Sequence, residues 1–144
     1  MANAFQLAEP ATVFMSTGVI HHFRGDALPR FLAQQAAAHA FIHADIKPTY
    51  LAPLGSWLFH RARMREPLAR HDGLLSARRA HAGAALVAAA RASCPDLAVG
   101  LVDGRREAVP LLRVMQTLVG VRRVLAPRFV NSLGALAGRI EALA

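Results

Sequence analysis

Residues 49–92 read TYLAPLGSWLFHRARMREPLARHDGLLSARRAHAGAALVAAARA and carry the most distinctive pattern of the chain. The segment begins just after Pro48, and Pro67 divides it at a position that suits the first turn of a helix. It predicts a short helix from residue 49 or 50, a turn, and a long helix over residues 68–93. Trp57, the single tryptophan, shares a helix face with Leu54 and Leu58. We therefore expect Trp57 to be a structural anchor packed where helices cross.

The remaining segments also show helical spacing of apolar residues. Asp26 is a candidate N-cap for a helix reaching about Asp45, and further helices are predicted over residues 105–126 and 128–144. Residues 97–102 fit a helical turn or a short strand equally well. The sequence thus predicts an all-α fold, an antiparallel bundle of four to five helices in a single domain, with residues 1–25 as an arm or short helix and residues 26–144 as the bundle.

Length and composition limit the alternatives. The chain has 144 residues, 54% of them hydrophobic, which suits one domain with one core. No apolar run approaches the roughly 20 residues that a membrane span needs. The first residues lack the pattern of a secretory signal, and the lone Cys94 cannot form an internal disulfide, so a cytoplasmic location is expected. The apolar last segment predicts packing on this domain or on a second copy, as in a homodimer.

Histidines provide the candidate metal ligands. On the predicted helix over residues 26–45, His39 and His43 are one turn apart and share a face, a spacing that can chelate a metal if a further ligand such as His81 approaches. Zinc is the candidate ion. Buried histidines satisfied by hydrogen bonds are the alternative. His21 and His22 are adjacent, so at most one of them can face a core.

The net charge of +8 lies entirely in residues 61–144. A basic surface of this kind can contact phosphates or an acidic protein partner, whereas arginines at solvated helix ends are the plainer interpretation. The arginines that would make such contacts are Arg61, Arg63, Arg65, Arg78, Arg79, Arg105, Arg106, Arg122 and Arg123.

Residues 52–58, APLGSWL, followed by residues 77–81, ARRAH, resemble the chemoreceptor zinc-binding (CZB) domain. The resemblance implies an all-helical bundle with a zinc site, in which His81 matches one ligand and His22 or His39 would be the upstream ligand. The family's cysteine and the first histidine of its pair fall on Ala52 and Ala77. Zinc binding would therefore require a rebuilt site.

Sequence motifs of catalysis are missing. The chain has no G-x-x-x-x-G-K-[ST], no G-x-G-x-x-G after a strand, no H-E-x-x-H and no paired cysteines. The sequence therefore predicts a non-enzymatic regulatory or sensory bundle that acts through contacts with a protein partner or a second copy, with a histidine-lined ligand or metal pocket. The alternative is a basic helical protein that binds nucleic acid through its arginine-rich second half.

Overall fold

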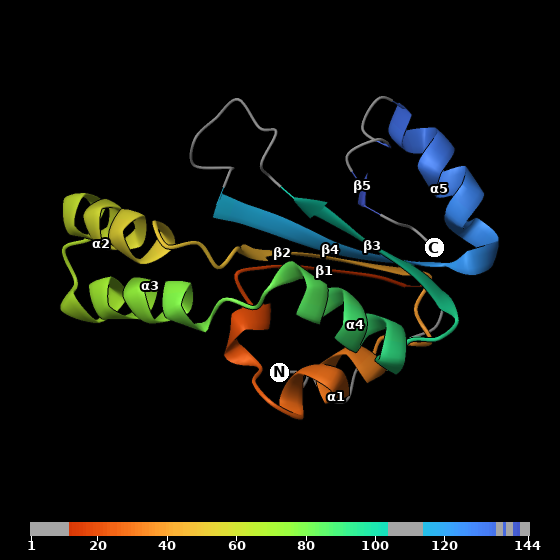
Figure 1. The fold of residues 1–144 in the computed structure, drawn as a ribbon, viewed down its shortest axis with the longest axis horizontal. Coiled ribbons are helices and arrows are strands. Elements are labelled where there is room, and N and C mark those ends of the chain that lie inside the picture. Colours follow the sequence, from red (N-terminus) through yellow and green to blue (C-terminus); the bar gives the residue numbers. More distant parts are fainter. Residues whose placement is uncertain (1–11, 104–113, 135–136, 138–139, 142–144) are drawn as a thin grey trace.

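The computed structural model describes residues 12–103, 114–134, 137 and 140–141, and these residues form a mixed α/β fold (Figure 1). The prediction of an all-α helical bundle was therefore wrong. In chain order the elements are β1 (Val13–Thr17), the 3-10 helix η1 (Ile20–His22), α1 (Ala27–Ala33), β2 (Ala40–Ile46), α2 (Ala52–Arg63), α3 (Pro67–Arg79), α4 (Gly83–Ser93), β3 (Leu97–Asp103), β4 (Met115–Arg122), the 3-10 helix η4 (Arg123–Leu125), α5 (Ala126–Leu133) and β5 (Ile140–Glu141).

The strands form one sheet in the order β1-β2-β4-β3-β5. β1 runs parallel to β2, whereas β4 is antiparallel to both of its neighbours, β2 and β3. The β1–β2 connection passes through η1 and α1, as a parallel pair requires, because two parallel strands cannot be joined by a tight turn. β1 thus belongs to the sheet and is not part of a separate N-terminal arm.

The two faces of the sheet are covered differently. On one face, α1 and α4 pack over a core that includes Phe31, Phe41, Leu86 and Leu118. On the other face, α5 brings Phe129 against a smaller cluster around Val119 and Val121. Successive strand residues point to opposite faces, so β2 presents Phe41, His43 and Asp45 toward α1 and α4. The residues of the candidate site therefore share a face with the main core.

Two segments predicted as helices are strands. Residues 40–46 form β2, and residues 115–122 form β4, where long helices over residues 26–45 and 105–126 were expected. Both strands are largely buried, because each has a neighbour on either side and helices over its faces. Such strands carry apolar residues on both faces, so their sequences lose the alternation that marks a half-exposed strand.

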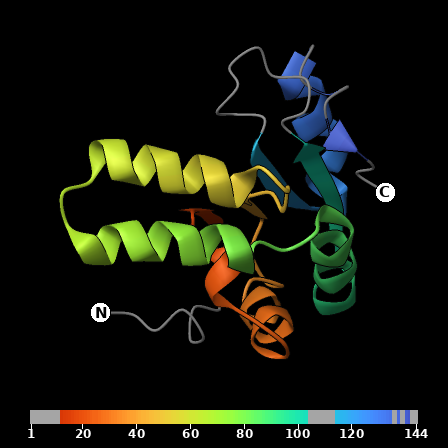
Figure 2. The same cartoon turned by 60° about the vertical axis from the view of Figure 1, so that its left-hand side comes forward.

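The segment that dominates the sequence pattern is a helical hairpin, and α2 and α3 lie side by side and project away from the sheet (Figures 1 and 2). Pro67 begins α3, as predicted, but the expected long helix over residues 68–93 ends at Arg79 and resumes at Gly83. Trp57 lies on the hairpin with 46% of its surface exposed. It therefore does not anchor a buried helix crossing, because the helices around it form a two-helix projection and not a bundle.

Candidate functional site at the carboxyl ends of β1 and β2

The two parallel strands end at the same edge of the sheet, which is where ligands bind in open α/β sheets. β1 ends at Thr17, and Gly18 then turns the chain with a φ of 67°, a left-handed conformation that side chains other than glycine rarely adopt. This turn leads into η1, which places His21 beside the end of β2. A sharp glycine turn after a strand thus positions the central residue of the site.

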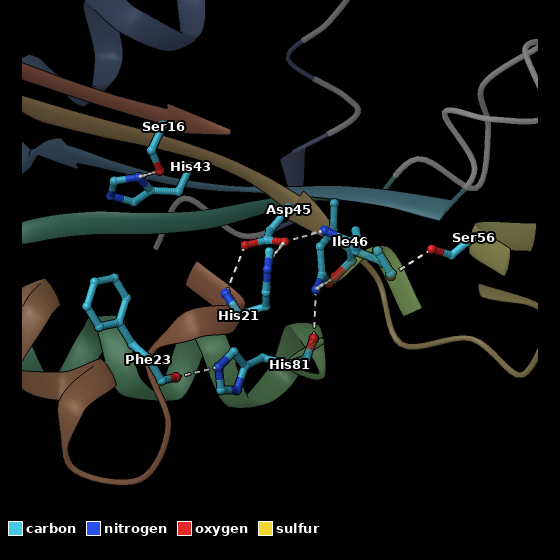
Figure 3. Close-up of polar contacts among 10 residues, drawn as sticks. Ser16, His21, Phe23, His43, Asp45, Ile46, Ser56 and His81 are labelled. Carbon is cyan, nitrogen blue, oxygen red and sulfur yellow. Dashed lines mark hydrogen bonds and ion pairs between the residues drawn. The ribbon is translucent and has the colours of Figure 1, made fainter. Parts of the chain in front are cut away.

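His21 and Asp45 form a buried pair (Figure 3). The Nδ1–H of His21 donates to Oδ1 of Asp45 at 2.8 Å, and the backbone N–H of His21 donates to Oδ2 at 3.0 Å. The backbone N–H of Ile46 donates to Oδ1 at 2.7 Å. His21 is 4% exposed, and its buried Nε2 has no hydrogen-bond partner among the residues that the structure describes. The carboxylate therefore fixes the ring with its proton on Nδ1 and leaves a lone pair on Nε2.

Both ring nitrogens of His43, two residues before Asp45, form hydrogen bonds. Its Nδ1 accepts from the hydroxyl of Ser16 at 2.7 Å, and its Nε2–H donates to Oε1 of Gln35 at 2.8 Å. Burial lowers the pKa of His43 from 6.5 to about 4, against a smaller opposing effect of the Asp45 charge. His43 is therefore a neutral structural residue that ties β1 to the segment after α1.

Further polar contacts hold the surroundings of the pair in place. Gln116, which is opposite Asp45 in the β2–β4 register, donates from Nε2 to the carbonyl of His81 at 2.7 Å. His81 in turn donates from its Nε2 to the carbonyl of Phe23, just after η1, at 2.8 Å (Figure 3). Lys47 and Asp103 form an ion pair at 2.6 Å beside this edge. The linker between α3 and α4 is thus fastened to the sheet and to η1.

The histidines proposed as metal ligands do not assemble. His39 precedes β2 and is exposed, His43 bonds to Ser16 and Gln35, and His81 bonds to the backbone of Phe23. Among the residues that the structure describes, no cluster of three or more histidine, cysteine or acidic side chains could hold a metal ion. The spacing of His39 and His43 was interpreted as one turn of a helix. In the structure, His39 lies just before β2 and His43 lies within it.

The predicted phosphate-contacting arginines are dispersed. Arg61, Arg63 and Arg65 lie at the far end of α2 and just beyond it, while Arg78 and Arg79 end α3. Arg122 donates to the carbonyls of Ala36 and Ala37, and Arg123 donates to that of Pro95, so both stabilise loops of the fold. Arg105 and Arg106 lie outside the described residues. The structure thus does not bring the predicted set together as one surface.

Sequence reasoning missed the partner of His21. The adjacency of His21 and His22 correctly predicted that at most one faces a core, and His22 is exposed. Asp45, however, was assigned to the end of a helix. The sequence feature that could have identified Asp45 is an acidic residue within an apolar run that contains β-branched residues, because acidic residues are unusual in buried strands. Cys94 is buried, which raises the pKa of its thiol to about 11 and leaves it unreactive.

The all-helical architecture implied by the CZB resemblance is not observed. A scan against protein-family models found no matching family. A search of curated proteins found no match. Among solved structures, the chain is similar to one described as a "putative O-methyltransferase" from Nostoc punctiforme PCC 73102, with a TM-score of 0.50 and 14% sequence identity. The match covers 83% of this chain and 34% of that protein, so this chain spans about a third of its length. At this identity the likeness concerns the fold alone.

Proposed function

We propose that this chain carries the acceptor side of a group-transfer site, in which His21 removes a proton from a substrate hydroxyl group. The observation that carries the proposal is the buried pair of His21 and Asp45 at the carboxyl ends of parallel strands, where Nε2 of His21 has no partner within the described part of the chain. The likeness in fold to a protein described as an O-methyltransferase suggests that the transferred group is methyl. The helical bundle expected from the sequence is not observed, whereas a regulatory role through protein contacts stays a prediction.

The chemistry follows from the orientation of the imidazole ring. Asp45 accepts the Nδ1 proton and stabilises positive charge on the ring, so Nε2 can take up a proton from an acceptor hydroxyl. The proton moves from oxygen to Nε2, and the electron pair of the broken O–H bond stays on the oxygen, which becomes the nucleophile. A positioned general base contributes on the order of 10²–10⁴-fold in rate.

An acceptor must displace part of the cover to reach Nε2. His21 lies in η1, against which α3 packs. His81, just after α3, donates to the carbonyl of Phe23, just after η1. The α2–α3 hairpin projects beyond the sheet and is joined to β2 by residues 47–51 and to α4 by residues 80–82. We infer that a displacement of α3 relative to η1 opens the path to His21.

The described residues do not fit the binding of a nucleotide-like methyl donor. They contain no glycine-rich turn between a strand and a helix, and the carboxylate nearest to the strand ends, Asp45, is already bonded to His21. We therefore assign only acceptor binding and proton transfer to these residues, and no step involving the donor.

The test is NMR of isotope-labelled histidine ring nitrogens, with phenol and catechol as hydroxyl-bearing probes. Wild type is expected to show Nε2 of His21 unprotonated and to show a shift of this resonance on addition of either probe. The matched control is His39, which is exposed and lies before β2, at the opposite end of that strand from Asp45, so its resonances should not shift. A protonated Nε2 in the absence of probe, or equal shifts at His21 and His39, would contradict the proposal.

A second measurement addresses the transferred group. Labelled methyl transfer from S-adenosylmethionine to catechol should fall by about 10²–10⁴-fold in His21→Asn and stay unchanged in His22→Asn. Binding of the probes at His21 without any methyl transfer in wild type would retain the base and would agree with a chain that carries only the acceptor side of the site.

A further inference from the structure

The outer face of α2 carries an apolar stripe that no part of the described structure covers. Leu51, Leu54, Trp57 and Leu58 recur at the spacing of one helix face, and between 46% and 71% of each side chain is exposed. At 100° per residue, these four residues, of which Leu51 is the N-cap, span about 120° of the helix, and the exposed Tyr50 immediately precedes them. The opposite face, with Ala52, Ser56 and His60, packs against α3. We call these five residues, from Tyr50 to Leu58, the apolar stripe.

The hairpin that presents this stripe is firmly built. The Ser56 hydroxyl donates to the carbonyl of Gly73 at 2.6 Å, and Nδ1 of His60 donates to the carbonyl of Ser56 at 2.7 Å. Gly73 leaves no room for a Cβ, because its position is filled by the His60 ring. The two helices therefore approach closely at this point, and the stripe is held facing outward.

The hairpin that presents the apolar stripe carries an excess of positive charge, and Arg61 borders the stripe. The hairpin carries six arginines, Arg61, Arg63, Arg65, Arg70, Arg78 and Arg79, against two acids, Glu66 and Asp72. The guanidinium of Arg61 lies 5.6 Å from the centre of the Trp57 ring, at the border between the stripe and the basic end of the helix. Arginine can keep its charged group in water while its aliphatic part follows an apolar surface.

We propose that the α2–α3 hairpin docks on the surface of an anionic phospholipid bilayer, with the apolar stripe entering the interface and the arginines contacting the headgroups. A helix with one apolar face, a tryptophan and flanking arginines has the features of a helix that lies in the membrane interface. An anionic lipid surface complements the excess of arginine over acidic residues on the hairpin. Within the described residues, no helix could cross the bilayer, so the contact is with its surface.

The charge distribution favours a bilayer over the other occupants. A second copy joined through this face by a two-fold axis would bring the same arginines together, which is unfavourable. A nucleic acid would pair with the arginines but would leave Leu54 and Leu58 in water. The stripe also lies opposite the face of α2 that contacts α3, away from His21. Substrate binding at His21 therefore does not account for it.

The test uses Trp57, which is the only tryptophan, so its fluorescence reports on the stripe alone. The full chain is mixed with vesicles of phosphatidylcholine, and with vesicles of phosphatidylcholine and phosphatidylglycerol. A blue shift of the emission and sedimentation with the vesicles are expected only with the anionic vesicles. Equal binding to both kinds of vesicle, or binding without a change in Trp57 emission, would overturn the proposal.

Two pairs of variants separate the contributions. Leu54→Ser with Leu58→Ser should weaken vesicle binding at least about tenfold, whereas Val124→Ser, which changes an even more exposed apolar side chain in η4, should not. Arg61→Gln with Arg63→Gln should weaken binding about fivefold per arginine, and Arg128→Gln, in α5, should have little effect. Comparable losses in the η4 or α5 controls would indicate adsorption by net charge and overturn the proposal.

Two other partners that could cover the apolar stripe, a second copy of the chain and DNA, are tested directly. Without vesicles, analytical ultracentrifugation is expected to show no dimer that covers the apolar stripe. The emission of Trp57 should not change with protein concentration. A dimer whose formation shifts Trp57 emission, or a DNA duplex that binds while anionic vesicles do not, would overturn the proposal. Because all variants change exposed residues, urea unfolding should give unchanged midpoints and exclude misfolding as the cause.

Discussion

At the scale of single residues, adjacent histidines have different roles. His21 is buried on Asp45, which lies 24 positions away, while His22 is exposed. The sequence could predict that only one of the two faces a core, because neighbouring residues of a helical turn point in different directions. It could not identify the partner, because the pairing depends on β1 and β2 being parallel neighbours.

Replacing Asp45 by asparagine tests how far the pair stabilises the fold. Asp45→Asn places an amide NH₂ group where one carboxylate oxygen accepts a hydrogen bond, so one buried donor loses its partner. The free energy of unfolding should fall by about 1–3 kcal/mol, measured by urea denaturation. Asp26→Asn is the matched control, because Asp26 is exposed and makes no capping hydrogen bond. Equal stability of the Asp45 variant and wild type would contradict this account of the pair.

His43 should make the stability of the protein depend on pH. Its pKa is lowered from 6.5 to about 4 by burial, so between these values the unfolded chain binds more protons than the folded chain. The contribution of His43 to stability is complete above pH 6.5 and is lost as the pH falls toward 4, up to about 3 kcal/mol in total.

The measurement is urea unfolding of wild type and His43→Asn over this pH range. The variant should show a smaller slope of stability against pH, while His22→Asn, which changes an exposed histidine, should keep the slope of wild type. A slope in His43→Asn equal to that of wild type would assign the pH dependence to other groups.

At the scale of elements, the sequence predicted the α2–α3 hairpin and the start of α3 at Pro67 but not the inner strands. Residues four apart, such as His39 and His43, share a face on a helix and also on a strand, so their spacing favoured neither. β2 and β4 are covered on both sides by other strands, and short apolar runs of this kind cannot be assigned from periodicity alone. The candidate site was missed for the same reason, since Asp45 lies in β2.

Two glycines in different elements should respond in opposite ways to alanine. At Gly120, in β4, an added Cβ would collide with the buried Phe41 ring, so Gly120→Ala should lower stability by about 1–3 kcal/mol. At Gly55, in α2, a Cβ meets open space, so Gly55→Ala should raise stability by about 0.5–1 kcal/mol. Urea unfolding measures both. Effects of the same sign would contradict the packing described for β4.

At the scale of the whole molecule, β1 lies at an edge of the sheet formed by the described residues. Its outward face shows Val13 and Met15, and 73% of Met15 is exposed. Parallel strands are usually covered on both faces, so exposed apolar side chains on one face of β1 are unusual. An apolar edge strand can pair with other chains and promote aggregation.

A lysine at the edge should reduce self-association. Met15→Lys places a charge on the exposed face of β1 and should slow aggregation on heating, while the free energy of unfolding changes by less than about 0.5 kcal/mol. Light scattering follows aggregation. Asn131→Lys adds the same charge to the exposed surface of α5 and should leave the aggregation rate unchanged. If both variants aggregate equally slowly, net charge and not the strand edge governs the process.

The place of β4 in the sheet also has a consequence for biosynthesis. β2 and β3 are each paired with β4, and β4 follows both of them in the chain. A nascent polypeptide that has emerged only as far as Asp103 therefore holds β1, β2 and β3 without the strand that joins them. Completion of the sheet awaits translation of residues 115–122, and until then hydrophobic strand edges are accessible to chaperones.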